Sequence, residues 1–172
     1  MKKALCVLAA VFLIIAAGCE KQPAKENVPS PPPISFTANL AVDFGGTPMT
    51  ALLTQKSSEE HTIQMLSPEV MKPLTLSYTN GICTVTYDGL TFESDANRFP
   101  QAEFGHLLTQ ALSSIAQDID IQKTYSEGIR TYKGTGDRGI FSLTRSEESG
   151  EWLEFTVEGA GLKVTFSQFS IV

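Results

Sequence analysis

Two dipeptides eight residues apart constrain the fold of this chain more than any other feature of its sequence. Asn80-Gly81 and Asp88-Gly89 each tolerate two successive residues with positive φ, as a two-residue type I′ hairpin turn requires. Such turns predict five facing pairs: Leu74 with Tyr87, Leu76 with Val85, Tyr78 with Cys83, Tyr87 with Leu90, and Val85 with Phe92. All these side chains are apolar or aromatic, and a slip of one residue would move them to the opposite, threonine-rich face. The pattern therefore specifies three consecutive antiparallel strands.

Alternation of apolar and polar residues predicts seven further strands on either side of this segment. They cover residues 34–42, 47–55, 62–66, 129–133, 140–145, 152–157 and 162–171. We expect Val42 to face Thr47 across a turn at 43–46, and Phe155 to face Val164 across the turn before the last strand. Phe169 is out of phase with Phe166, which predicts a bulge near Ser167.

A single long helix is expected over residues 100–117, after the first six strands. Its apolar residues recur at helical spacing and form one stripe: Phe104, Leu107, Leu108, Ala111, Leu112 and Ile115. This stripe must dock on the sheet. The predicted fold class is therefore α+β, with a continuous antiparallel sheet of about ten strands and the helix packed on one of its faces.

The first nineteen residues have the organisation of an export signal. Lys2 and Lys3 precede an apolar run over residues 4–17, which is too short for an untilted membrane span of about 20 residues. The run ends at Ala16-Ala17-Gly18-Cys19, which resembles the lipobox of bacterial lipoproteins. The resemblance implies that residues 1–18 are a lipoprotein signal peptide and that the thiol of Cys19 receives a diacylglyceryl group. An ordinary cleaved signal with a chance cysteine is the alternative.

Residues 19–33 are expected to form the lipidated cysteine and a tether. From Glu20 to Pro33 the chain is polar and proline-rich, so it cannot bury a core and favours extended conformations. A proline-rich ligand for a partner protein is the alternative interpretation. The folded domain then covers residues 34–172, in which Cys83 is the only thiol and is expected to be a small buried hydrophobe.

The charge of the chain excludes some partners. The formal net charge is -6 and the isoelectric point is about 4.9. A nucleic-acid-binding surface needs basic side chains to displace counterions from phosphates, so we expect no nucleic-acid partner. Anionic lipid headgroups are poor partners for the same reason.

Signals for catalysis are weak, and we expect no enzyme activity, no catalytic residue, no metal site and no cofactor. The G-x-G-x-x-G spacing at residues 134–139 precedes a strand-like segment rather than a helix, which favours a hairpin turn. His61 and His106 show no metal-ligand spacing, so both are predicted to be surface residues. The pairs Glu59-Glu60 and Glu147-Glu148 flank turns and are expected to be solvated charge.

The order of elements resembles the LolA/LppX-like half-barrel superfamily of lipoprotein carriers and lipid-binding lipoproteins. The most similar stretch runs from Thr62 to Phe92, with a proline after one strand and with the two strand-ending turn dipeptides. Phe99-Pro100 leading into Leu107-Leu108 is similar to the segment that follows in that superfamily. The resemblance implies a half-barrel whose concave face is apolar and whose helix acts as a lid or plug.

These expectations combine into one functional hypothesis. The protein is a bacterial lipoprotein, anchored through Cys19 to the extracytoplasmic side of the cell membrane, that binds a lipid or another apolar ligand in the concavity of the sheet. One helix is too small to cover the apolar face of ten strands laid flat, so either the sheet curls around the helix or an apolar groove remains for such a ligand. The ligand-binding residues are expected to be Leu74, Leu76, Tyr78, Val85, Tyr87, Phe92, Phe104, Leu108 and Leu112. The alternative is a structural or adaptor lipoprotein that binds a protein partner through its outer face or a sheet edge.

Overall fold

The computed structural model describes residues 31–95 and 103–172, and these residues form one large antiparallel sheet with a helix, α2 (Glu103–Gln117). The predicted signal peptide, Cys19, most of the tether, and residues 100–102 of the predicted helix lie outside the described residues. The eleven strands are β1 (Phe36–Phe44), β2 (Thr47–Gln55), β3 (Glu60–Ser67), β4 (Leu74–Thr79), β5 (Ile82–Tyr87), β6 (Leu90–Asp95), β7 (Gln122–Ser126), β8 (Ile129–Gly136), β9 (Gly139–Ser146), β10 (Trp152–Val157) and β11 (Leu162–Ile171). Two short 3₁₀ turns, η1 (Glu69–Met71) and η4 (Glu158–Ala160), join strands.

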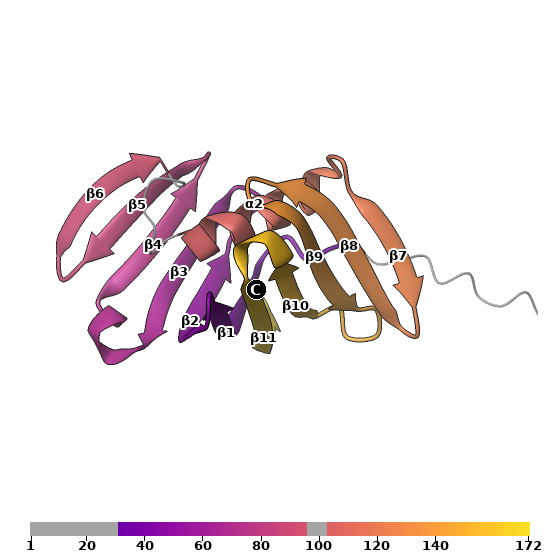
Figure 1. Ribbon diagram of the computed structural model, residues 1–172, viewed down its shortest axis with the longest axis horizontal. Helices are drawn as coiled ribbons and strands as arrows, with labels where there is room; N and C mark the ends of the chain where they lie inside the picture. Colours follow the sequence, from indigo (N-terminus) through magenta and orange to yellow (C-terminus); the bar gives the residue numbers. More distant parts are fainter. Residues whose placement is uncertain (1–30, 96–102) are drawn as a thin grey trace, which may run out of the picture.

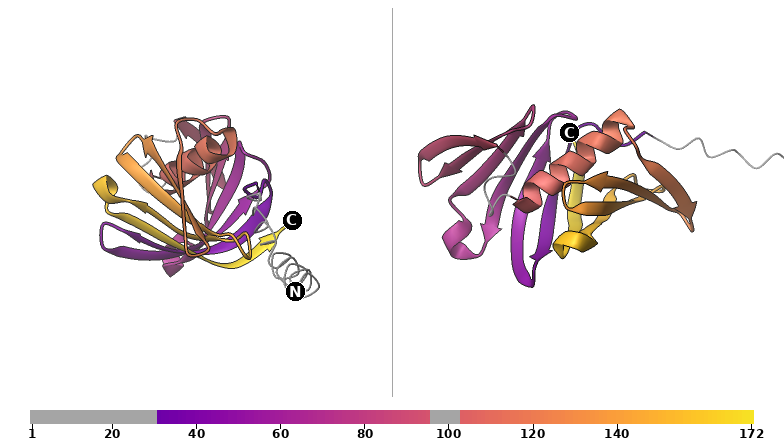
Figure 2. Two further views of the ribbon diagram at one scale, coloured as in Figure 1. Left: turned by 90° about the vertical axis from the view of Figure 1, so that its right-hand side faces the viewer. Right: turned by 45° about the horizontal axis from the view of Figure 1, so that its top comes forward.

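The sheet is curved and open. Its spatial order is β6-β5-β4-β3-β2-β1-β11-β10-β9-β8-β7, so the first and last strands in the chain meet in the middle, and β6 and β7 form the two edges. The strands bend around one side, and α2 lies inside that bend, crossing from the β4 side to the β8 side (Figure 1, Figure 2). The predicted half-barrel with one helix on its concave face is thus confirmed in outline, with eleven strands rather than about ten.

The two hairpins that constrain the sequence have the predicted register. Tyr78 faces Cys83, and Val85 faces both Leu76 and Phe92. Asn80 and Gly81 have φ values of 51° and 80°, and Asp88 and Gly89 have φ values of 48° and 81°, as two-residue type I′ turns require. Short-range turn chemistry therefore sets this part of the sheet.

The first hairpin differs from the prediction by two residues. Val42 faces Met49 rather than Thr47, because the chain reverses at Gly45-Gly46 and Phe44 pairs with Thr47. Both glycines have positive φ, 59° and 81°, which makes the tighter turn accessible. Because the shift is an even number of residues, the apolar side chains stay on the predicted face.

The C-terminal half of the sheet contains one strand that the sequence pattern did not predict. All five residues of β7 are exposed, so burial imposes no alternation on this edge strand. Phe155 pairs with Val164, and residues 134–139 form the β8–β9 hairpin, both as predicted. The predicted bulge is present at Gln168, which has a φ of 49° and lies where the register between β1 and β11 shifts.

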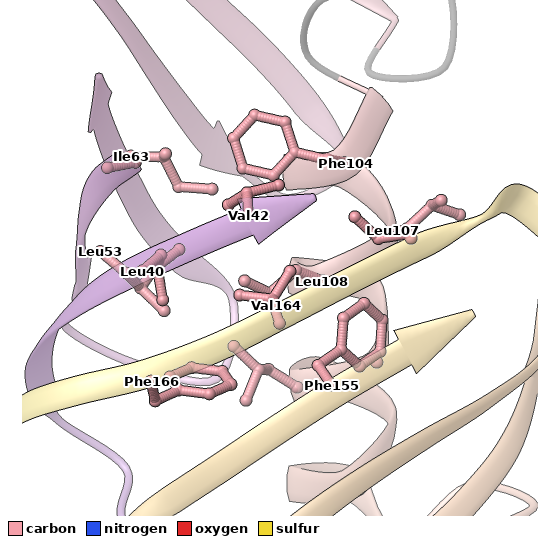
Figure 3. Close-up of a cluster of buried hydrophobic side chains, with 14 of the residues drawn as sticks. Leu40, Val42, Leu53, Ile63, Phe104, Leu107, Leu108, Phe155, Val164 and Phe166 are labelled. Atoms are coloured by element: carbon pink, nitrogen blue, oxygen red, sulfur yellow. The ribbon is translucent and has the colours of Figure 1, made fainter. Parts of the chain in front are cut away.

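The core lies between α2 and the concave face. Every residue of the predicted helix stripe is buried. Figure 3 shows Phe104, Leu107 and Leu108 of α2 facing Val42 and Val164 from the two central strands. Large apolar side chains contribute about 1.5–3 kcal/mol each when fully buried, so this contact is a major source of stability.

Candidate ligand-binding surface

Seven of the nine residues predicted to bind an apolar ligand are core residues. They are buried on β4, β5 and α2: Leu74, Leu76, Tyr78, Val85, Phe104, Leu108 and Leu112. The helix stripe meets the centre of the sheet, where Phe104 and Leu108 lie beside Val42 and Val164, as well as the β4 side (Figure 3). In this arrangement α2 fills the middle of the concavity, as a plug would.

The remaining two predicted residues lie beyond the cover of α2. Tyr87 is 42% exposed and Phe92 is 46% exposed, and their neighbour Leu90 is 73% exposed. All three share the face of Val85, which is buried, because Phe92 pairs with Val85 and Leu90 pairs with Tyr87. We call Tyr87, Leu90 and Phe92 the open end of the concave face. The apolar face of the sheet thus continues past the helix that covers it.

Close packing fixes α2 against β3 and β4. A Cβ atom added at Gly105 would lie 2.5 Å from the Tyr78 hydroxyl oxygen and 2.9 Å from the Ile63 Cδ1 atom. Both distances are shorter than van der Waals contact allows, so a Cβ atom here would force the ends of the Tyr78 and Ile63 side chains to shift. The apolar periodicity of the helix does not show that position 105 must be small, so this close contact could not be predicted from the sequence pattern.

Polar contacts tie the other flank of α2 to the β8–β9 turn. His106 Nε2 lies 2.9 Å from an Asp137 carboxylate oxygen, and the Gln110 side-chain amide donates to the other oxygen at 3.2 Å. The hydrogen bonds from His106 and then from Gln110 hold the pKa of the Asp137 carboxyl below its usual range. Arg138 from the same turn pairs with Glu103 at the beginning of the helix. These contacts join residues about 30 positions apart in the chain. At that separation, the spacing of residues in the sequence does not predict which side chains meet.

His61 is buried, so its prediction as a surface residue was wrong. Side chains alternate between the two faces along β3, so His61 points to the same, concave face as Ile63 and Met65. On the neighbouring strand β4 it lies opposite Tyr78. Burial lowers the pKa of His61 from 6.5 to about 4, which keeps the imidazole neutral. Its Nε2 atom is buried without a hydrogen-bond partner among the described residues. The adjacent acidic pair, Glu59-Glu60, concealed the burial of this position.

Cys83 is a free, buried cysteine, as predicted. Burial raises the pKa of its thiol, and a hydrogen bond with Tyr78 only partly opposes that effect. Burial also raises the pKa of Tyr78 well above its usual range. Both groups therefore remain protonated near neutral pH, and Cys83 lacks the thiolate that a nucleophile needs.

In the pair Glu147-Glu148, Glu148 is exposed as predicted, whereas Glu147 is less solvated than predicted. Glu147 accepts two hydrogen bonds from the Arg130 guanidinium, at 2.7 and 3.1 Å, and both side chains are largely buried. Within residues 31–95 and 103–172, no group of three or more His, Cys, Asp or Glu side chains could hold a metal ion. No helix in the same residues is long and apolar enough to cross a membrane.

Comparison with known proteins adds information on the fold. No protein-family model matches the chain. No curated protein matches it either. Among solved structures, an uncharacterized conserved protein from Thermus thermophilus superposes with a TM-score of 0.52 and 9% sequence identity, over 86% of this chain and 82% of that chain. A LolA superfamily protein from Nitrosomonas europaea gives a TM-score of 0.45 at 10% identity, over 85% and 90% of the two chains.

A DUF1329 family protein from Desulfovibrio piger gives a TM-score of 0.43 at 9% identity, over 81% of this chain and 86% of that chain. At such low identities, likeness extends to the fold alone. The open antiparallel sheet with a helix in its concavity is thus an arrangement that this chain shares with the Thermus protein over most of both lengths.

Proposed function

We propose that this protein is a membrane-anchored extracytoplasmic lipoprotein that binds a lipid or another apolar ligand on the concave face of its sheet. The ligand contacts the open end first, and its apolar chain extends toward the β4 side of α2. Deeper entry, to Leu74, Leu76 and Val85, requires α2 to shift from its docked position.

One observation carries this proposal. The concave face changes from buried at Val85 to exposed at Tyr87, Leu90 and Phe92 without changing its apolar character. An exposed apolar surface that continues a hydrophobic core is costly to leave in water, and such surfaces mark ligand or partner sites. The outer face of the same strands is threonine-rich, so the two faces of the sheet differ in chemistry.

A matched pair of variants tests the ligand site. Phe92→Asp places a charge on the concave side of β6, whereas Ile82→Asp places one on the outer side of β5, where Ile82 is similarly exposed at 51%. We expect Phe92→Asp to weaken binding of the methyl ester of a dansylated undecanoic acid by about tenfold or more, because a carboxylate must be desolvated beside the acyl chain. Binding is measured by the dansyl fluorescence, with Ile82→Asp as the control that retains wild-type affinity.

Equal losses in the two variants, or no binding by the wild type, would contradict a concave-face site. A loss confined to Ile82→Asp would place the acyl-chain site on the outer face and would also contradict the proposal.

The anchor is tested separately at Cys19. The proposal predicts that Cys19→Ala abolishes incorporation of labelled palmitate and releases the protein from the membrane pellet, because two or three acyl chains are needed for stable anchoring. Cys6→Ala, in the same predicted signal, is the matched control and should leave both labelling and sedimentation unchanged. Labelling that persists in Cys19→Ala would show that the resemblance to the lipobox is fortuitous.

A further inference from the structure

A pocket lies on the polar side of α2, away from the apolar stripe of the helix that enters the core. It has a volume of about 350 Å³, within the range of small-molecule sites. His61, Tyr78 and Thr109 contribute buried side chains to it. The α2 residues that line it recur at helical spacing: His106, Thr109, Gln110, Ser113, Ser114 and Gln117. The polar stripe of the helix therefore forms one wall of a pocket whose other wall comes from β3 and β4.

His61 supplies an unsatisfied polar atom at this pocket. The side chain is 2% exposed, and its Nε2 atom has no hydrogen-bond partner among the described residues. A buried polar group without a partner is destabilising, so such groups are rare unless something else satisfies them. A ligand that hydrogen-bonds to Nε2 would remove this cost.

Several other polar side chains at the pocket are also available to a ligand. Ser114, Gln117 and Asn80 make no side-chain hydrogen bond within the described part of the chain. Ser113, in contrast, donates to the carbonyl oxygen of Ser58 at 2.6 Å, which fixes this wall to the β2–β3 loop. A ligand could thus hydrogen-bond to one hydroxyl, from Ser114, and to two carboxamides, from Gln117 and Asn80.

The charge of the lining selects the class of ligand. None of the residues that line the pocket is a lysine or an arginine, and Glu59 contributes a carboxylate, so an anionic ligand would be repelled. A cation would find only that single carboxylate. An acyl chain would leave the hydroxyl, amide and imidazole groups without partners.

We infer that this pocket binds a neutral, polyhydroxylated group of the saccharide type, with His61 Nε2 as one of its hydrogen-bond partners. The group is either a free saccharide or the sugar headgroup of a glycolipid. This inference does not depend on the apolar ligand proposed above, because the pocket and the open end use different residues.

The test uses the imidazole nitrogen resonances, which are simple to assign because the chain has only two histidines. The full-length gene product, labelled with ¹⁵N-histidine and held in phosphatidylglycerol nanodiscs, is titrated with the methyl glycosides of glucose, galactose, mannose and N-acetylglucosamine. A second arm compares plain nanodiscs with nanodiscs that contain diglucosyldiacylglycerol. We expect the free glycosides, the glycolipid nanodiscs, or both, to shift the Nε2 resonance of His61.

Variants of α2 establish where the sugar binds. Ser114→Leu fills the pocket and should abolish the shift, whereas Ala116→Leu, on an exposed position that does not line the pocket, should retain it. His61→Phe should weaken binding about tenfold, measured by saturation-transfer NMR on the glycoside, because one buried hydrogen bond is lost.

A shift with the free glycosides identifies a saccharide site, and a shift only with the glycolipid nanodiscs identifies a headgroup site. If no probe shifts the His61 resonance, or if Ser114→Leu and Ala116→Leu behave alike, the inference is overturned. Absence of dansyl-lipid binding by the wild type would leave these outcomes unchanged, so failure of the two proposals is distinguishable.

Discussion

The imidazole of His61 is neutral in the folded protein because the side chain is buried on the concave face of the sheet. Its pKa is about 4 in the fold and about 6.5 in an unfolded chain, so the unfolded state binds more protons between these values. The free energy of unfolding should therefore fall as the pH drops from about 6.5 to about 4, by on the order of 3 kcal/mol. Urea unfolding at a series of pH values measures this slope.

The control for this prediction is the second histidine. His61→Gln should remove most of the slope between pH 6.5 and 4, and His106→Gln is the matched substitution at the only other histidine of the chain. A slope that is unchanged in His61→Gln would show that another group titrates in this window.

At the scale of elements, the position of α2 depends on the absence of a side chain at Gly105. Gly105→Ala raises helix propensity by about 1 kcal/mol but forces a Cβ atom against the Tyr78 hydroxyl and Ile63. Overpacking of this kind costs about 1–3 kcal/mol, so we expect a net loss of stability of up to about 2 kcal/mol. Tyr78→Phe removes the nearest obstructing atom and should recover part of this loss in the double variant.

A double-mutant cycle in urea measures this coupling. Additive effects of Gly105→Ala and Tyr78→Phe would show that the helix and β4 are not in the close contact described above.

At the scale of the whole molecule, local rules predicted most of the sheet. The Asn80-Gly81 and Asp88-Gly89 turns gave the correct register because a type I′ turn leaves little freedom. The periodicity of apolar residues correctly predicted the buried stripe of α2, because one face of the helix must enter the core. The exposed strand β7 was missed because no burial pattern marks an edge strand whose residues all face solvent.

The site was harder to predict than the fold. Alternation correctly grouped Val85 and Phe92 on one face, but it could not show that α2 covers the first and leaves the second exposed. That difference depends on where the helix crosses the sheet, which long-range contacts such as those of Gly105 and Asp137 decide. The buried position of His61 was missed because two glutamates precede it, a pattern that is typical of a solvated segment.

The central claim is that an apolar guest occupies the part of the concave face that α2 does not cover. Native mass spectrometry of the full-length gene product, released from its own membranes, tests this claim most directly. The account predicts a species heavier than the covalently modified protein by the mass of one lipid, which dissociates on collisional activation while the covalent modification stays. A single mass in every charge state, equal to that of the covalently modified chain alone, would contradict it.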